Sequence, residues 1–177
     1  MAKIFVSHAV RDQELAEAVV ELLQLGSGVS GDQIFFSSGP GMGVPTGSRF
    51  NEYIRKEVED AALVVAILSP AFRESAFSTA EVGAAWVLQG NFFPMTVPGY
   101  GHRDLDGVLI GVQVPPLDDP QALAELHDRA CAALNFAGDT TRWANQQAKF
   151  LARLEDLAAR LDGPRLIPYE QLEEIET

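Results

Sequence analysis

One acidic side chain stands alone in a long apolar stretch of the sequence. Between Ser75 and His102, Glu81 is the only residue with a formal charge. At helical spacing it shares its side of the helix with the apolar residues Phe77, Ala84, Ala85 and Leu88. A carboxylate that is shielded from water can act in catalysis, for example by stabilising positive charge on a reacting substrate. Glu81 is therefore the first candidate for a catalytic residue.

The same residue has a purely structural alternative. The segment Ser78-Thr79-Ala80-Glu81 is typical of a capping box, in which the Glu carboxylate accepts a hydrogen bond from the first backbone amide of the helix. The sequence leaves both interpretations open.

A second candidate is the glycine-rich segment 37–48, which reads SSGPGMGVPTGS. It contains no Gly-Lys-Ser/Thr sequence and follows the second predicted strand, so the likeness to a phosphate-binding loop is superficial. A mobile loop over a binding crevice, or an exposed contact loop, is the better interpretation. Ser48 and Arg49 begin the next helix, where free amides and a guanidinium can hold an anion; a plain helix cap is the alternative.

Metal and disulfide chemistry have little support. The single cysteine, Cys131, lies among alanines and is expected to be a small buried hydrophobe. The three histidines, His8, His102 and His127, lack metal-ligand spacing, and each is expected at the surface or at a helix end. We therefore predict no metal and no bound cofactor.

Composition excludes several further classes. The chain has 177 residues, which predicts one domain, and a formal charge of −12 without any basic cluster. That charge disfavours nucleic acid and anionic lipid as partners. Apolar runs are too short to span a bilayer, and the N-terminus does not resemble a signal peptide, so we expect a cytoplasmic protein.

Short apolar runs alternate with amphipathic stretches along the chain, a pattern typical of a parallel α/β sheet. We predict a flavodoxin-like three-layer sandwich whose five-stranded sheet has the order 2-1-3-4-5. The predicted strands are 4–6, 34–36, 63–68, 92–97 and 108–114, and the predicted helices are about 14–23, 49–60, 78–90 and 121–134. Gly26 and Gly28 are expected to end the first helix.

That topology places a crevice at the carboxyl ends of strands one and three, where the strand order reverses. Ser7 and His8 follow the first of these strands, and Ser69-Pro70 follows the other. His8 is therefore a candidate for contact with a bound molecule. Neither strand ends in the acidic cluster that a phosphate-accepting receiver domain needs, and no Gly-x-Ser-x-Gly turn surrounds Ser7, which argues against a hydrolase nucleophile.

Residues 139–177 differ from the domain predicted over 1–138. Six residues follow a heptad spacing of 4, 3, 4, 3 and 4: Trp143, Gln147, Phe150, Leu154, Leu157 and Leu161. They predict a C-terminal helix that packs either on its own domain or on another chain. Residues 168–177 carry four Glu and are expected to form a solvated tail.

Taken together, three segments resemble a bacterial Toll/interleukin-1 receptor (TIR) domain. The first is Lys3-Ile-Phe-Val-Ser-His-Ala9 with Asp12, which is similar to the family's opening strand. The others are Leu63–Pro70 and Ser75–Glu81, which are similar to the third strand and to the helix that bears the family's acidic residue. Segment 37–48 falls at the family's variable loop.

The resemblance implies cleavage of NAD+ at the nicotinamide–ribose bond, by a glycohydrolase or an ADP-ribose cyclase, with NAD+ as substrate. Glu81 matches the catalytic glutamate, and Phe77 stands where the family often has Trp. Phe77 would pack against the substrate. Phe5, Ser7 and His8 would line the nicotinamide end, while Phe36 and the loop from Ser37 to Ser48 close over it.

The resemblance also leaves other functions open. Some TIR domains are non-catalytic adaptors that assemble with their own kind, and self-association is expected in either case. Nucleoside deoxyribosyltransferases share the sheet and a catalytic Glu. Similarity to stand-alone bacterial TIR proteins implies antiphage defence of the Thoeris type, with a separate effector or sensor protein as a possible partner.

Overall fold

The computed structural model describes residues 3–36, 56–74, 91–101 and 112–161. Within these residues the strands are β1 (Ile4–Ser7), β2 (Ile34–Phe36), β3 (Leu63–Leu68) and β4 (Phe92–Thr96). The helices are α1 (Gln13–Leu22), α3 (Pro70–Glu74), α5 (Pro120–Leu134) and α6 (Thr140–Leu161), and residues 56–59 form a further helical turn.

The four strands of the described ranges form one parallel sheet of order β2-β1-β3-β4. This order confirms the predicted doubly wound α/β topology for the first four strands. β1 is central, because it pairs with β2 through Phe5 and Phe35 and with β3 through Ser7 and Ala66. The carboxyl ends of β1 and β3 therefore lie side by side, with β2 on the other side of β1.

The predicted fifth strand, 108–114, is only partly within the described residues. Residues 112–114 join no ladder, and β4 meets the following segment at a single parallel bridge between Thr96 and Pro116. Thr96 donates its amide to the Pro115 carbonyl at 3.0 Å and accepts from Leu117 at 2.9 Å. Pro115 and Pro116 have no N–H, so the pairing cannot extend through them as a regular ladder.

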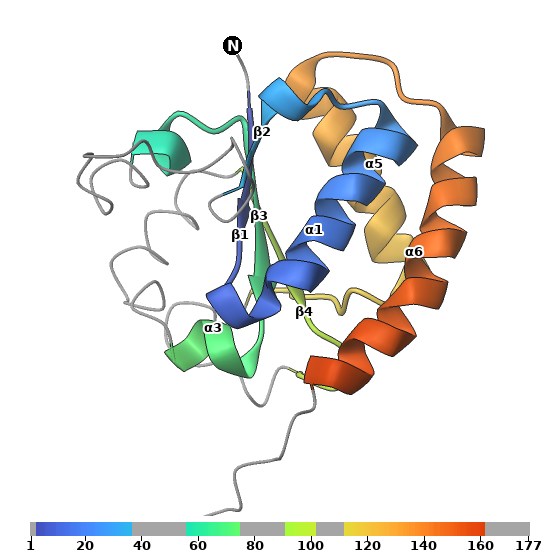
Figure 1. Cartoon of the computed structure of the whole chain (residues 1–177). Helices are drawn as coiled ribbons and strands as arrows, with labels where there is room; N and C mark the ends of the chain where they lie inside the picture. Colours follow the sequence, from blue (N-terminus) through green and yellow to red (C-terminus); the bar gives the residue numbers. More distant parts are fainter. Residues whose placement is uncertain (1–2, 37–55, 75–90, 102–111, 162–177) are drawn as a thin grey trace, which may run out of the picture.

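Alternate residues of the strands form two separate cores, one on each face of the sheet. One face packs Ile4, Val6, Val65 and Ile67 against α1, α5 and α6. The other face packs Phe5, Phe35, Val64, Ala66 and Leu68 against Val58 and Phe72. Figure 1 shows α1, α5 and α6 together on one side of the sheet and α3 on the other.

The first helix ends differently from the prediction. After Leu22 the chain continues as a π-helical segment, Leu23–Ser27, so that Gly26 lies inside it rather than ending it. Gly28 then adopts a left-handed conformation with φ +80°, which a residue without a Cβ accepts without strain. The terminating role predicted for the glycines therefore belongs to Gly28.

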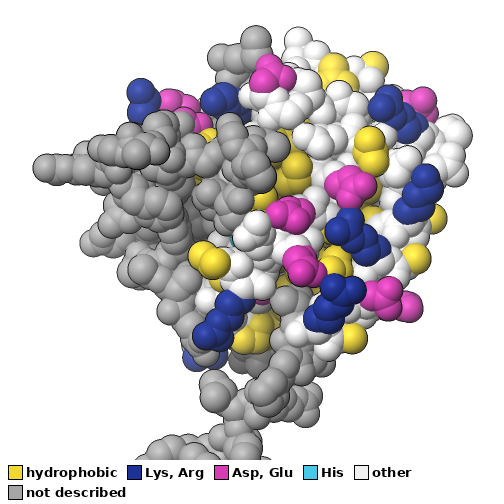
Figure 2. Space-filling model, viewed as in Figure 1, with side chains coloured by type: hydrophobic (Ala, Val, Ile, Leu, Met, Phe, Trp, Pro, Cys, Tyr) yellow, Lys and Arg dark blue, Asp and Glu magenta, His cyan; other side chains and the backbone are white. Residues whose placement is uncertain are grey.

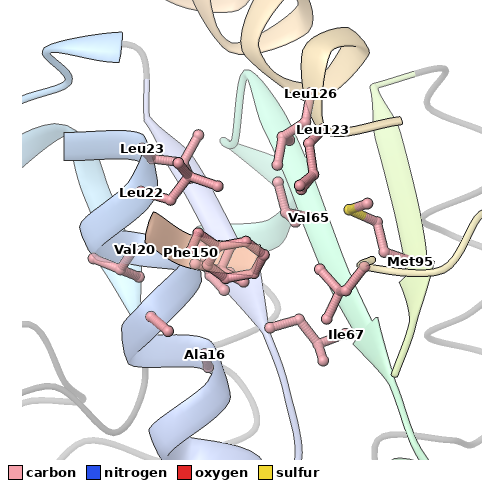
Figure 3. Packing of buried hydrophobic residues seen from close by; sticks show 14 of the residues in the cluster. Ala16, Val20, Leu22, Leu23, Val65, Ile67, Met95, Leu123, Leu126 and Phe150 are labelled. Atoms are coloured by element: carbon pink, nitrogen blue, oxygen red, sulfur yellow. The ribbon is translucent and has the colours of Figure 1, made fainter. Parts of the chain in front are cut away.

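The C-terminal helix α6 packs on its own domain. Its heptad residues Trp143, Phe150, Leu154 and Leu157 are buried in the same core as α1, and Figure 3 shows Phe150 among residues of α1 and the sheet. Gln147 accepts a 2.7 Å hydrogen bond from Trp143 Nε1, which explains how a polar residue fits in the seam. The first of the two predicted interpretations is confirmed for these residues.

Ion pairs tie the outer faces of α1 and α6 together. Arg153 contacts Glu21 at 2.7 Å and Arg160 contacts Glu14 at 3.3 Å. Figure 2 shows acidic and basic side chains interspersed on this face of the molecule. Both pairs are solvent-exposed, so each contributes little, and the buried seam provides most of the attachment.

His127 and Cys131 lie one helical turn apart on α5. Cys131 is buried, as predicted. His127 is only 4% exposed and lies in the middle of α5, so the expectation of a surface or helix-terminal position is wrong for this histidine. The His127 ring packs on Trp143 at 4.9 Å between centroids, and its Nε2 lies 3.6 Å from Cys131 Sγ. The arrival of α6 buries this histidine, which the local sequence of α5 does not reveal.

The close approach of α6 generates a stability prediction at Gly26. A Cβ at that position would lie 2.7 Å from Trp143 Cε3, and a buried indole cannot retreat easily. Gly26→Ala should lower the free energy of unfolding by about 1–3 kcal/mol, measured by urea denaturation. At Gly31 a Cβ meets only the end of the Gln24 side chain at 3.3 Å, so Gly31→Ala is the matched control. Equal losses in the two variants would contradict this packing.

Candidate functional site

The candidate site begins where β1 ends. Ser7 is the last residue of β1, which is flanked by β2 and β3, and His8 follows it. Both side chains are buried, at 4% and 8% exposure. Their position at the carboxyl edge of the central strands is the predicted switch point of the sheet.

The imidazole of His8 lies flat against Phe36 at the end of β2. The two rings are 4.6 Å apart between centroids with 18° between their planes, and His8 Nδ1 lies 3.4 Å from the Val6 carbonyl oxygen. Burial lowers the pKa of His8 below its ordinary value, against the opposing effects of the Val6 carbonyl and the Glu17 charge. The lowered pKa favours the uncharged form of the imidazole at pH 7.

Asp12 and Ser69 connect the loop after β1 to the end of β3. Ser69 Oγ donates a hydrogen bond to Asp12 Oδ2, and both residues are 2% exposed. Ser69 also accepts the Phe72 amide at 2.9 Å, which caps α3. Burial raises the pKa of Asp12, although the Ser69 hydrogen bond, the Ala9 backbone and the Arg11 charge act in the opposite direction.

Of the predicted substrate contacts, the structure brings Ser7, His8 and Phe36 together at one edge. Phe5 lies deeper, 2% exposed on the face of the sheet opposite to Phe36, where its ring stacks on Phe35 at 5.3 Å. Five further candidates lie outside the described residues: Ser37, Ser48, Arg49, Phe77 and Glu81. The roles assigned to all of these residues stay predictions.

Neither a metal cluster nor a membrane-spanning helix occurs in the part of the chain that the structure describes. No three His, Cys, Asp or Glu side chains converge there as metal ligands. None of the described helices combines the length and apolarity needed to cross a bilayer.

Comparison with known proteins identifies the family to which this chain belongs. Residues 4–126 match the family model of the TIR domain, a range that includes β1, β3 and the candidate glutamate. The chain belongs to the TIR domain family. It is also 30% identical over 154 residues to the Bacillus subtilis (strain 168) "Uncharacterized protein YddK". That alignment covers 86% of this chain and 57% of the relative, so the chain spans little more than half of the relative's length.

The link between Asp12 and Ser69 is the part of the site that sequence reasoning missed. Asp12 lies between Arg11 and Gln13, a setting that predicts a solvated helix start rather than a buried carboxyl group. The position of Ser69 was easier to predict than that of Asp12, because Ser followed by Pro is typical of a helix N-cap. The partnership itself spans 57 positions and requires the topology of this TIR domain to be known.

Burial of His8 generates a pH prediction. Its pKa is lower in the folded chain, so the unfolded state binds more protons and stability is lost as pH falls below about 6.5. The free energy of unfolding should therefore drop less between pH 7 and pH 5 in His8→Phe, whose ring can still stack on Phe36, than in the wild type. Urea denaturation at the two pH values measures this difference. Asp12, whose pKa is also shifted, is present in both proteins, so its contribution cancels in the comparison. An equal drop in the two proteins would contradict the assignment.

Proposed function

We propose that this TIR domain cleaves NAD+ at the bond between nicotinamide and ribose, with Glu81 as the catalytic carboxylate. The observation that carries the proposal is the coincidence of two facts. Glu81 is the one formal charge between Ser75 and His102, and it lies within the range matched by the TIR domain model. A single acid in an apolar segment of a family with NAD+-cleaving members supports an enzymatic role.

The chemistry suits a single carboxylate that is shielded from water. Nicotinamide leaves with the electron pair of the C1′–N bond, which makes it neutral and leaves an oxocarbenium-like ribosyl cation. A carboxylate beside the ribose can hydrogen-bond its hydroxyl groups and stabilise that charge. Water that then attacks C1′ and loses a proton gives ADP-ribose, whereas an internal nucleophile gives a cyclic product.

The carboxyl edge of the sheet supports this assignment with residues of suitable chemistry. His8 stacks its uncharged ring on Phe36, and Ser7 ends the strand that leads to His8. In this proposal the small exposed part of His8 contacts the planar nicotinamide ring, and a neutral imidazole adds no charge that would repel this cationic ring. Phe77 and the loop residues Ser37, Ser48 and Arg49 complete the site in this proposal.

The proposal extends to the cellular setting that the resemblance implies. The reaction takes place in the cytoplasm, and the ADP-ribose product serves as a signal to a separate effector in antiphage defence. Self-association through TIR surfaces brings the chains together for catalysis. In this proposal NAD+ is consumed as the substrate, and the carboxylate acts without a metal or a bound cofactor.

Substitution of the carboxylate tests the proposal directly. Glu81→Gln keeps the size of the side chain but removes its charge, and we expect nicotinamide release to fall at least about a hundredfold. Nicotinamide is measured by chromatography after incubation of purified protein with NAD+. Glu125→Gln, on the exposed side of α5, removes the same charge away from the site and should leave release unchanged.

Two results would contradict the assignment. Unchanged turnover in a folded Glu81→Gln protein would exclude Glu81 as the catalytic group. A wild-type protein that self-associates yet leaves NAD+ intact would favour the adaptor role instead, and a protein that consumes nucleosides would favour a deoxyribosyltransferase.

A further inference from the structure

A buried hydrogen bond joins the two chain segments that leave the central strands. Asp12 follows β1 by five residues, and Ser69 comes directly after β3. Their side chains meet through the bond from Ser69 Oγ to Asp12 Oδ2, and water has almost no access to either residue. Buried bonds between a hydroxyl and a carboxyl group are strong and directional, so this one fixes the two segments relative to each other.

The other hydrogen bond of Ser69 shows that its hydroxyl group is the donor to Asp12. The Phe72 amide donates to Ser69 Oγ at 2.9 Å, so the single hydroxyl proton of Ser69 remains for Asp12. The Ser69 carbonyl also accepts the Arg73 amide at 3.1 Å. The start of α3 is thus connected through Ser69 to the start of α1.

His8 lies within the segment that this contact closes. The segment begins at the end of β1 and ends at Asp12, whose amide donates to the Ala9 carbonyl at 2.9 Å. One end of the segment is held by the sheet and the other by Ser69. Between these two fixed ends, the His8 ring rests on Phe36.

We propose that Asp12 and Ser69 are positioning residues, whose hydrogen bond holds His8 against Phe36 and so shapes the wall of the nucleotide crevice. The role in substrate binding rests on the proposed function; the placement of His8 does not. Neither residue is assigned contact with the substrate. Loss of the bond should free residues 8–12 from β3, admit water to the imidazole and misplace the wall on which the substrate rests.

Removal and restoration of the hydroxyl group test the proposal. In Ser69→Ala the hydrogen bond is lost, so the pKa of His8, followed by NMR of its ring protons, should rise from its lowered position toward its ordinary value. Ser69→Thr keeps a hydroxyl, and Asp12→Asn keeps an acceptor oxygen, so both should retain the lowered pKa. Glu17, which also acts on His8, is unchanged in all three variants.

Kinetics provide the second measurement. The kcat/KM for nicotinamide release from NAD+ should fall about ten- to a hundredfold in Ser69→Ala and stay near the wild-type value in Ser69→Thr. Leu154→Ala is the control for general loss of stability, because Leu154 is a buried core residue of α6, 1% exposed, and belongs to neither of the two segments that the Asp12–Ser69 bond joins. It should lower the unfolding midpoint without moving the His8 titration.

The two proposals fail in different ways. An unchanged His8 titration in Ser69→Ala, or an equal shift in Leu154→Ala, would overturn the positioning role whether or not NAD+ is cleaved. A wild-type protein that releases no nicotinamide would overturn the proposed function, and the His8 titration alone would then decide the positioning role.

Discussion

The parallel pairing of β1 between β2 and β3 is the constraint on which the rest of the molecule depends. Because all three strands run the same way, their carboxyl ends meet at one edge, where the chain must leave the sheet in different directions. Ser7 and His8 leave from β1, Phe36 ends β2, and Ser69 follows β3. Residues far apart in sequence thus lie close together, although the local sequence around each of them does not predict this proximity.

The two faces of the sheet give this edge its rigidity. Alternate residues of each strand are buried on opposite sides, so a shift of one residue in register would move every apolar side chain into the wrong core. On one face, α6 adds a further layer over α1, and its buried Trp143 packs against Gly26. The site is therefore supported by a core that extends well beyond the residues matched by the TIR domain model.

The sequence predicted what depends on local pattern and missed what depends on long-range contact. Uninterrupted apolar runs identified β1 and β3, and the order of four strands followed from the alternation with helices. The same reasoning expected His127 at the surface, because the helix that buries it begins at residue 140. It placed His8 correctly at the carboxyl edge of the sheet, because His8 directly follows a strand that lies between two others. Glu81 and Phe77 lie outside the described residues, so their roles stay predictions.

The proposed reaction breaks one bond, between nicotinamide and ribose, and its products identify that bond. Mass spectrometry of the products formed from NAD+ at high protein concentration distinguishes cleavage at this bond from cleavage at the pyrophosphate. We expect nicotinamide with an equal amount of ADP-ribose, linear or cyclic. NAD+ that remains whole in the presence of folded, concentrated protein, or that is cut at its pyrophosphate, would contradict this proposal.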